Sequence, residues 1–344
     1  MGSPTRFAAG AGTRSHVLRR GGRAMNIRKE IRKLSGPERL AFTNTLLALK
    51  GNGGYDKYVH WHHAVMVPTV HPDEPQDPDY RNGAHLGPAF LPWHREMLLQ
   101  LEADLQAITP GITLPYWDWT LDAADPTNSP VWEQSLLGGD GDAADEFRVQ
   151  DGPFAYRYGN WPVPAYPEDG LPGAGLKRQF SRLVNSLPTA ADLQMAMNEE
   201  LYDEPNYTSS PFNRGFRNRL EGWITQKGDP QVTTPGSQLH NRVHLWIGGN
   251  MLAMTSPEDP VFFLHHCFID KIWADWQAQM MLDKPALAPH YCPMQDDPTG
   301  HNYDDVIKPW TRRIREVMDI TALGYAYEPA SPLTKRPFKS PFMA

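Results

Sequence analysis

The sequence predicts a mainly α-helical fold, in which a four-helix-bundle core is wrapped by long loops. Apolar residues recur at helical spacing in several segments, and capping or helix-breaking residues bound these segments. Histidines gather in two windows, residues 60–94 and 240–266, which fall on the same segments. Because helices of a bundle can direct side chains into a shared interior, we expect the two windows to build one site.

The first expected helix follows Ser35, because Ser35 and Glu38 have the spacing of a capping box. Its apolar stripe consists of Phe42, Leu46 and Leu49, and Gly51-Asn52-Gly53-Gly54 ends the pattern. A second helix is expected over residues 55–66, YDKYVHWHHAVM, which contain no helix breaker. The stretch at 68–88 is rich in Pro, Asp and Asn and predicts an irregular loop.

A long third helix is expected up to Thr109-Pro110-Gly111. One face of it carries Phe90, His94, Leu98, Leu101 and Leu105, so His94 should point inward. Residues 121–212 are dense in Gly, Pro and Asp, with only a weak helical signal near 188–201. Most of this stretch is therefore expected to be ordered loop.

Three further helical segments follow. FRNRLEGW at 216–223 is the first, and LHNRVHLWIGG at 239–249 is a short helix closed by Gly248 and Gly249. The last is expected to be capped by Ser256, with Pro257 in its first turn, and to continue to residue 281. Beyond residue 282 the chain is Pro-rich, and the sequence defines its structure poorly.

Composition excludes several classes of function. The formal net charge of −7 does not provide the basic surface that nucleic-acid binding requires. No run of about 18 apolar residues is present for a membrane span. The two cysteines, Cys267 and Cys292, have no C-x-x-C partner and are expected to be free thiols, which favours a reducing compartment such as the cytoplasm.

The ends of the chain differ from its middle. Residues 1–24 hold five arginines and no acidic residue, and no apolar segment of a secretory signal follows them. We expect residues 1–24 to be a disordered basic arm and residues 328–344 to be a C-terminal tail. Residues 25–327 should form one domain, because any boundary between the two histidine windows would split the site.

The histidine spacing predicts metal binding. His240 and His244 are four residues apart, which places both imidazoles on one helix face. A single buried histidine is more often an ordinary hydrogen-bonded core residue, but a buried cluster without metal would leave many ring nitrogens unpaired. Imidazole suits zinc, copper, iron and nickel, whereas hydrolytic two-metal sites usually also recruit carboxylates. Windows made of histidine alone therefore favour copper.

Several motifs together resemble the type 3 copper proteins, which are the tyrosinases, catechol oxidases and haemocyanins. The similarity is greatest to the short bacterial tyrosinases and o-aminophenol oxidases. It rests on HWHH at 60–63, NGAHLGPAFLPWHRE at 82–96, LHNRVHLWIGG at 239–249 and SPEDPVFFLHHCFIDKIW at 256–273. PYWDW at 115–119 and Tyr325-Ala326-Tyr327 also resemble family segments, whose role is packing. The resemblance implies a copper domain over 25–327, two copper ions and O2 as co-substrate.

The resemblance also implies which histidines are ligands. His62, His85 and His94 would hold the first copper, and His240, His244 and His266 the second. His62 is preferred over His60 and His63 from its alignment with the family's helix. His266 is preferred over His265 because the family pattern His-x-x-x-Asp is matched by His266 and Asp270. Gly83 stands where plant and fungal members often have a cysteine, which excludes a thioether link to His85.

The implied activity is oxidation of phenols by O2. Glu221 and Asn241 match the pair thought to hold a proton-accepting water in tyrosinases, and the alternative role for Glu221 is an ion pair with Arg217 or Arg219. Leu245 and Ala253 match positions beside the substrate. The expected partners are a small phenolic substrate and a copper-delivery protein.

Other functions are weaker alternatives. An o-aminophenol or catechol oxidase would lack monophenol hydroxylation. An O2 carrier like haemocyanin is disfavoured, because only 17 residues follow Tyr327, too few for a β-rich lid domain. A zinc hydrolase would need bridging carboxylates that the two windows do not offer.

Overall fold

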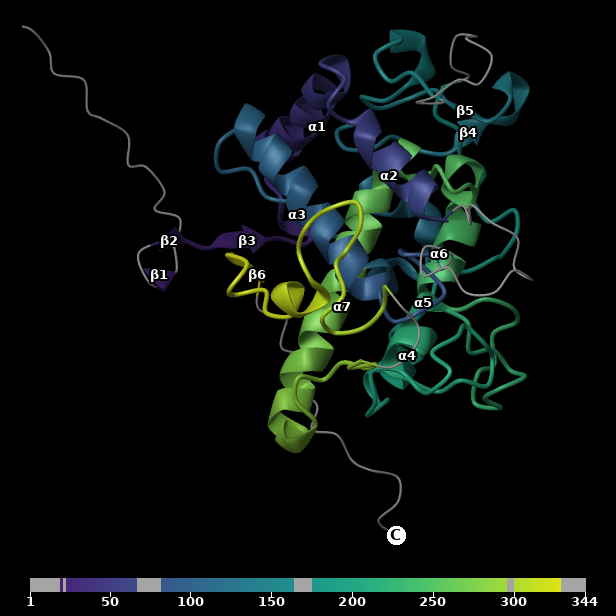
Figure 1. Ribbon diagram of the computed structural model, residues 1–344. Helices are drawn as coiled ribbons and strands as arrows, with labels where there is room; N and C mark the ends of the chain where they lie inside the picture. Colours follow the sequence, from purple (N-terminus) through teal and green to yellow (C-terminus); the bar gives the residue numbers. More distant parts are fainter. Residues whose placement is uncertain (1–18, 21–22, 67–81, 164–174, 296–299, 329–344) are drawn as a thin grey trace, which may run out of the picture.

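A computed structural model describes residues 19–20, 23–66, 82–163, 175–295 and 300–328 (Figure 1). The predicted mainly α fold is confirmed. Helix α7, Val261–Asp283, runs through the middle of the molecule, and α3, Phe90–Ile108, packs along it. Within the described parts of the chain, no helix is both long and apolar enough to cross a lipid bilayer.

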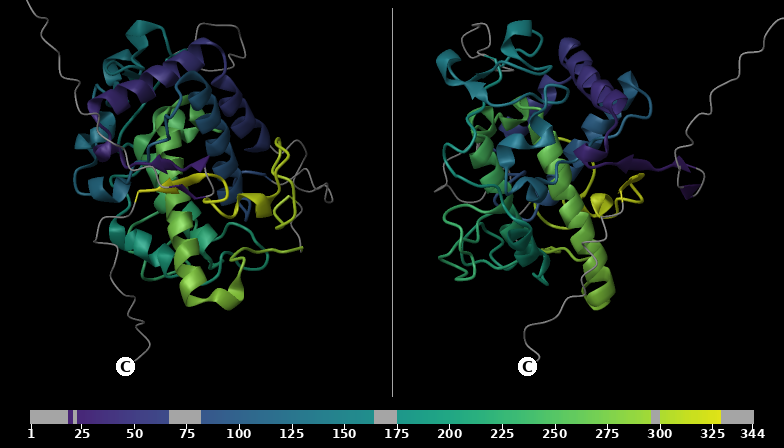
Figure 2. Two further views of the ribbon diagram at one scale, coloured as in Figure 1. Left: turned by 90° about the vertical axis from the view of Figure 1, so that its left-hand side faces the viewer. Right: turned by 180° about the vertical axis from the view of Figure 1, so that it is seen from behind.

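The remaining helices surround this central pair (Figure 2). Helices α2, Asp56–Met66, and α6, Leu239–Ile247, complete the set that carries the histidine windows. Helix α1, Gly36–Gly51, packs against α3. The short helices α4, Ala190–Met197, and α5, Phe216–Glu221, pack against each other, and α5 also contacts α6. The described residues between α3 and α4 run mainly as loops and single 3-10 turns, as predicted.

The predicted start of α1 is confirmed. The Glu38 N–H donates to Ser35 Oγ, and the Ser35 N–H donates back to the Glu38 carboxylate, which completes the capping box. The predicted start of the last helix is wrong. Ser256–Glu258 forms a separate 3-10 turn, and α7 begins at Val261, whose N–H donates to the Asp259 carboxylate at 3.0 Å. That carboxylate also binds Arg178, which fixes it at this corner.

The Pro-rich chain beyond residue 282, which the sequence defines poorly, contains a strand near its end. Strand β6, Tyr325–Tyr327, pairs in parallel with β3, Asn26–Arg28, so both ends of the domain meet in one two-stranded sheet (Figure 1). The sequence does not predict this pairing, because the two strands lie about 300 residues apart in the chain and each is only three residues long. Residues 329–344, most of the predicted tail, lie outside the described residues.

Two further short strand pairs are present. In the predicted arm, β1, Arg19–Arg20, pairs antiparallel with β2, Arg23–Ala24, whereas residues 1–18 and 21–22 lie outside the described residues. In the long loop region, β4, Gly141–Asp142, pairs antiparallel with β5, Arg148–Val149. Residues 67–81 of the predicted irregular loop are likewise not described, and residues 82–88 are not helical.

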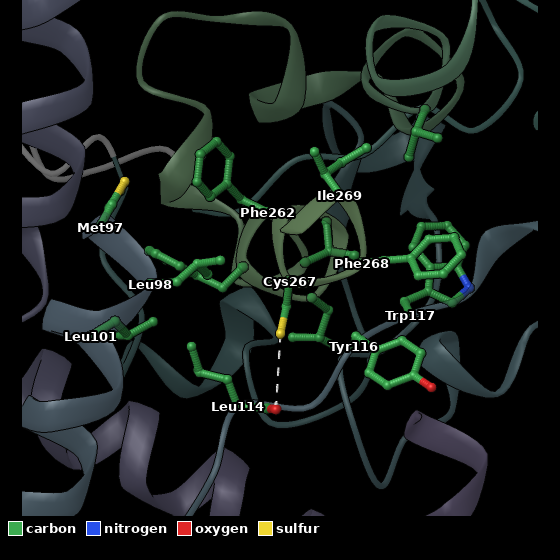
Figure 3. Close-up of a cluster of buried hydrophobic side chains, with 14 of the residues drawn as sticks. Met97, Leu98, Leu101, Leu114, Tyr116, Trp117, Phe262, Cys267, Phe268 and Ile269 are labelled. Atoms are coloured by element: carbon green, nitrogen blue, oxygen red, sulfur yellow. Dashed lines mark hydrogen bonds between the residues drawn. The ribbon is translucent and has the colours of Figure 1, made fainter. Parts of the chain in front are cut away.

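The core between α3, α7 and the 114–117 segment is apolar. Figure 3 shows Met97, Leu98 and Leu101 of α3 facing Phe262, Phe268 and Ile269 of α7, with Leu114, Tyr116 and Trp117 closing the cluster. The thiol of Cys267 lies within this cluster, 4.0 Å from the Leu114 carbonyl oxygen. Burial raises the pKa of Cys267 to about 12, so it remains a protonated thiol. Neither Cys267 nor Cys292 forms a disulfide.

A buried ionic network locks the two chain ends to this core. Arg28 of β3 binds the Glu102 carboxylate at 3.0 Å, and Arg95 binds Asp270 of α7 at 2.5 Å. The hydroxyl groups of Tyr325 and Tyr327 both donate to Asp270, at 2.7 and 2.5 Å.

Asp270 is the shared acceptor of this network, and the neighbouring arginines keep its carboxyl group ionised. Burial alone would raise the pKa of Asp270, but attraction to Arg95 and Arg28 outweighs it and holds that pKa below the ordinary value. Asp270 is therefore the charge that balances the network.

Asp270→Asn should lower the free energy of unfolding by roughly 3–5 kcal/mol, because it leaves the buried Arg95 guanidinium without its carboxylate. Since the folded pKa is depressed, the stabilisation is present above a carboxyl pKa of about 4 and is lost as pH falls through the lower folded value. Urea unfolding at fixed copper content, measured across acidic pH, should show a flatter pH dependence in the variant. Asp275→Asn, which removes a half-exposed partner of Lys271 on the same helix, should cost less than about 1 kcal/mol. Equal losses in the two variants would contradict this role of Asp270.

Candidate metal centre

The first histidine cluster contains His62 of α2, His85 of the loop before α3 and His94 of α3. One ring nitrogen from each lies within 4.8 Å of the others, and all three side chains are buried. The neighbouring His60 and His63 are exposed because they lie on the outer face of α2. The structure therefore brings together the three residues of the predicted first copper site.

His85 is placed by turns rather than by a helix. The side-chain oxygen of Asn82 accepts the N–H groups of Ala84 and His85, at 3.0 and 2.8 Å, which forms an Asx turn. Tyr202 donates its hydroxyl to the Pro88 carbonyl oxygen at 2.6 Å, so a residue from the long loop region holds the same segment. Sequence reasoning missed both residues. An Asn three residues before a ligand is a usable signal for the first, but nothing local marks Tyr202.

The second cluster contains four imidazoles, from His240 and His244 of α6 and His265 and His266 of α7. The His266 Nε2 lies 3.3 Å from Nε2 of His240 and 3.4 Å from Nε2 of His244. His265 instead stacks its ring on His240, with centroids 5.1 Å apart, and neither of its ring nitrogens has a hydrogen-bond partner among the described residues. His266 thus has the converging geometry that a ligand requires, and it stays our predicted ligand.

Backbone carbonyl groups fix the outer nitrogens of three rings. Nδ1 lies 2.6 Å from the Met254 carbonyl oxygen in His62, 2.8 Å from that of Phe90 in His94 and 2.8 Å from that of Met251 in His244. Each carbonyl group can only accept, so each Nδ1 carries the proton and each Nε2 presents a lone pair to the interior.

The inward nitrogens fit a metal ion. Nε2 of His62 and of His94 is buried and has no hydrogen-bond partner among the described residues. The Nε2 atoms of His240 and His266 face each other at 3.3 Å. Two lone pairs at this distance repel, so a proton or a cation must lie between them. Such orphaned, converging lone pairs are the arrangement that an imidazole-bound metal satisfies.

Burial also keeps these imidazoles neutral. Desolvation lowers the pKa of His62 to about 3 and that of His244 to about 4. The pKa values of His85, His94, His240, His265 and His266 are also lowered well below 6.5, chiefly by burial. Metal ligation requires the neutral form, so protons do not compete for these nitrogens near neutral pH.

The two clusters face each other across a short gap. The rings of His94 and His266 are stacked, with centroids 4.1 Å apart. Phe262 packs against His266 at 4.1 Å and against His62 at 5.1 Å, so one phenyl ring borders both clusters. Two metal ions held by these groups would therefore be close neighbours, as the prediction of a single site requires.

Known proteins are similar to this chain in sequence. The profile of the common central domain of tyrosinase matches residues 52–279, which span both histidine clusters. The chain belongs to the tyrosinase family. It is 38% identical over 286 residues to a tyrosinase of Streptomyces glaucescens, covering 83% of this chain and 93% of that one. It is 35% identical over 322 residues to the grixazone synthase of Streptomyces griseus, covering 88% of this chain and 99% of that one.

Solved structures share the fold. A polyphenol oxidase from Thermothelomyces thermophila superposes with a TM-score of 0.64 at 23% identity, covering 88% of this chain and 89% of that one. A functional unit of octopus haemocyanin gives a TM-score of 0.53 at 21% identity, covering 88% of this chain and 68% of that one. Because the fold occurs in both kinds of protein, it does not by itself separate an oxidase from an O2 carrier.

The sequence relatives make that distinction. Tyrosinase-family enzymes contain two copper ions and use O2, and the relatives at 35–39% identity over most of the chain are oxidative enzymes. The protein is therefore a type 3 copper oxidoreductase that oxidises phenols or aminophenols, as the motifs predicted. Its two clusters would hold the copper ions, and bound copper would supply the reaction with O2.

The structure places the predicted catalytic pair next to the second cluster. Glu221 is fully buried at the end of α5, and its carboxylate accepts the Leu86 N–H and the Arg217 guanidinium, both at 2.8 Å. The side-chain oxygen of Asn241 lies 2.9 Å from Nδ1 of His240. The ion pair of Glu221 with Arg217, weighed as its alternative role, is therefore present, and a catalytic role stays a prediction.

The predicted substrate-side residues lie on either side of the second cluster. Leu245 is half-buried and follows His244 directly on α6. Ala253 is exposed and lies between Met251 and Met254, whose carbonyl groups hold His244 and His62. Their contact with substrate stays a prediction, but both flank residues that position the imidazoles.

Copper analysis tests the ligand assignment. Replacing His62, His85, His94, His240, His244 or His266 by Ala should reduce copper below two ions per chain and abolish O2 consumption, because each ring is placed to supply one of three donors. His60→Ala and His63→Ala should retain both ions, since those side chains are exposed. His265→Ala should also retain them. Loss of copper from His265→Ala with retention in His266→Ala would reverse the assignment within that pair.

Proposed function

We propose that this enzyme hydroxylates monophenols as well as oxidising o-diphenols to quinones. The observation that carries the proposal is the fully buried Glu221. Its backbone carbonyl oxygen lies 3.4 Å from Nδ1 of His240, and its carboxylate accepts the N–H of Leu86, the residue after His85. A phenol with a pKa of about 10 loses its proton at pH 7 at a cost near 4 kcal/mol, so a base beside the site is needed. An o-diphenol loses its electrons more readily and depends less on that base.

Glu221 has the capacity to take this proton despite its two hydrogen bonds. A carboxylate has about four lone-pair sites, and the Leu86 N–H and Arg217 occupy only two of them. In this proposal the phenolic proton passes to a Glu221 oxygen through water. Asn241 contributes by holding Nδ1 of His240, which keeps that ring's other nitrogen directed inward.

The entrance should accept substituted rings. Ala253 carries a small side chain at the position that would gate the site, and the adjoining Leu252 and Met254 are also exposed and apolar. Leu245 would border the ring of a docked phenol from α6. An apolar rim of this kind favours aromatic substrates, and Ala253 leaves room for ring substituents.

Aminophenol oxidation is the second candidate. The relatives do not share one named activity, since tyrosinases and a grixazone synthase match at similar identity. An o-aminophenol oxidase lacking monophenol hydroxylation would use the same clusters but would not need Glu221 as a base.

Copper delivery belongs to the same proposal. The clusters are almost fully enclosed, and Cys267 and Cys292 are free thiols, which suits a reducing compartment such as the cytoplasm. A partner protein that transfers reduced copper would suit both the enclosed clusters and a reducing compartment. Complete loading by free copper at the same rate as by a cell extract would argue against such a partner.

A substrate panel tests the main proposal. Oxygen uptake by the copper-loaded protein should be measured with a monophenol, the matching o-diphenol and the matching o-aminophenol. We expect consumption with the monophenol and the o-diphenol, the latter being faster. Uptake with o-aminophenol and o-diphenol alone would move the protein to the second candidate, and binding of O2 without consumption would indicate a carrier.

Glu221→Gln tests the base. The substitution keeps the size of the side chain and an oxygen that can accept from Leu86 or Arg217, but it removes the proton-accepting charge. Its rate on monophenols should fall by about 10²-fold or more, whereas its rate on o-diphenols should fall much less. Copper content should be checked in parallel. Equal losses on both substrates at full copper content would mark Glu221 as structural.

A further inference from the structure

A continuous row of aromatic rings leads away from the first histidine cluster. The Trp93 ring lies 5.1 Å from that of His94 and 5.8 Å from that of His62, measured between centroids. Trp310 lies 5.1 Å from Trp93, and Trp61 lies 5.3 Å from Trp310. Trp93 is buried, whereas Trp310 and Trp61 are half-buried, so the row runs from the cluster toward the surface.

Three separate parts of the chain build this row. Trp93 belongs to α3 and Trp61 to α2, whereas Trp310 comes from the segment 300–328, which crosses α3 in Figure 1. The Trp93 indole N–H donates to the Lys308 carbonyl oxygen at 2.8 Å, which anchors that segment against α3. The row therefore depends on a part of the chain whose structure the sequence defines poorly.

Beyond Trp61 the row turns back into the interior and reaches Tyr58, a fully buried tyrosine that has a proton acceptor. Tyr58 lies 5.3 Å from Trp61 and donates its hydroxyl to a carboxylate oxygen of Asp104 at 2.6 Å. Asp104 is partly exposed and also pairs with Lys57 at 2.5 Å. Burial and the Asp104 carboxylate raise the pKa of Tyr58 well above 10, so Tyr58 keeps its proton unless it is oxidised.

We infer that Trp93, Trp310, Trp61 and Tyr58 form an electron-transfer path that supplies electrons to the copper centre when no phenol is bound. Aromatic side chains at these separations can be oxidised one after another, each taking an electron from the next. The histidine ligands at the inner end are then spared from oxidation. This path rests on the family's copper and O2 chemistry and is independent of the role proposed for Glu221.

Local contacts set where the oxidation stops. The Trp310 indole nitrogen is buried and has no hydrogen-bond partner among the described residues, so nothing there accepts a proton from an oxidised ring. The Lys57 ammonium group lies 5.4 Å from the Trp61 centroid and disfavours a lasting positive charge on that ring. Tyr58 differs, because Asp104 can take its proton as the electron leaves.

The overall step balances. One electron leaves Tyr58 and reduces the oxidised copper centre by one equivalent, and each tryptophan on the way returns to its original state. The O–H bond of Tyr58 breaks, and an O–H bond forms on the Asp104 carboxylate. A neutral tyrosyl radical remains at Tyr58, which is fully buried, so an added reductant such as ascorbate restores it by electron transfer through the half-buried Trp61.

Freeze-quench electron paramagnetic resonance tests the path. Copper-loaded protein, without phenol, is mixed with hydrogen peroxide, and oxidised residues are located afterwards by peptide mass spectrometry. We expect a tyrosyl signal that narrows when tyrosine is deuterated and disappears in Tyr58→Phe. Trp310→Phe should also abolish it and should shift oxygen incorporation from Trp61 to Trp93 and the ligand histidines. Asp104→Asn should replace the tyrosyl signal by a tryptophanyl one.

Matched controls separate the path from simple exposure. Trp223 is the other half-buried tryptophan and makes no ring contact with a described residue, so Trp223→Phe should leave the signal and the pattern unchanged. Copper-free protein should show neither the tyrosyl signal nor oxidised residues. Trp61→Phe tests the same path should Trp310→Phe fail to fold. An unchanged tyrosyl yield in folded Trp310→Phe or Trp61→Phe, or equal oxidation of Trp223 and Trp61, would overturn the inference.

Discussion

The gathering of seven uncharged imidazoles in one place, six of them buried and His244 half-buried, is the constraint on which the rest of this structure depends. Desolvation excludes the charged form of each ring, so every ring must keep one N–H and one lone pair satisfied without solvent. Metal ions can take the lone pairs. The chain supplies backbone oxygens at fixed positions as acceptors for the N–H groups of His62, His94 and His244.

One loop provides acceptors for both clusters. Met251 holds His244 of the second cluster and Met254 holds His62 of the first, so a few residues fix the two halves of the site relative to each other. Gly249 allows the loop to start where it does. Its φ of +53° lies in the left-handed region, and a Cβ there would come within 2.0 Å of the Lys177 carbonyl oxygen. The glycines after α6 therefore serve the metal centre as well as ending the helix.

Helices and histidine windows could be predicted from the sequence because their determinants are local. The Ser35 capping box, the breakers after α3 and the spacing of His240 and His244 each lie within a few residues. The β3–β6 pairing, the carbonyl acceptors and the position of Trp310 could not be predicted, because they join segments far apart in sequence through groups with no distinctive side chain. The bond from the Val261 N–H to Asp259 at the start of α7 was not predicted, because Ser256 offers the more usual capping signal.

The buried charges around Glu221 favour the binding of cations nearby. Arg217 binds both Glu221 and Asp203, so two buried carboxylates share one guanidinium and leave a net negative charge when both are ionised. Burial raises the pKa of Asp203 to about 6, and attraction to Arg217 opposes the shift. Keeping this buried carboxylate ionised therefore costs free energy in the chain alone. The imidazole ligands are neutral and cannot balance the charge of bound copper. A negative cluster beside the second histidine cluster reduces that imbalance, so the cost borne by the chain is offset when the metal ions bind.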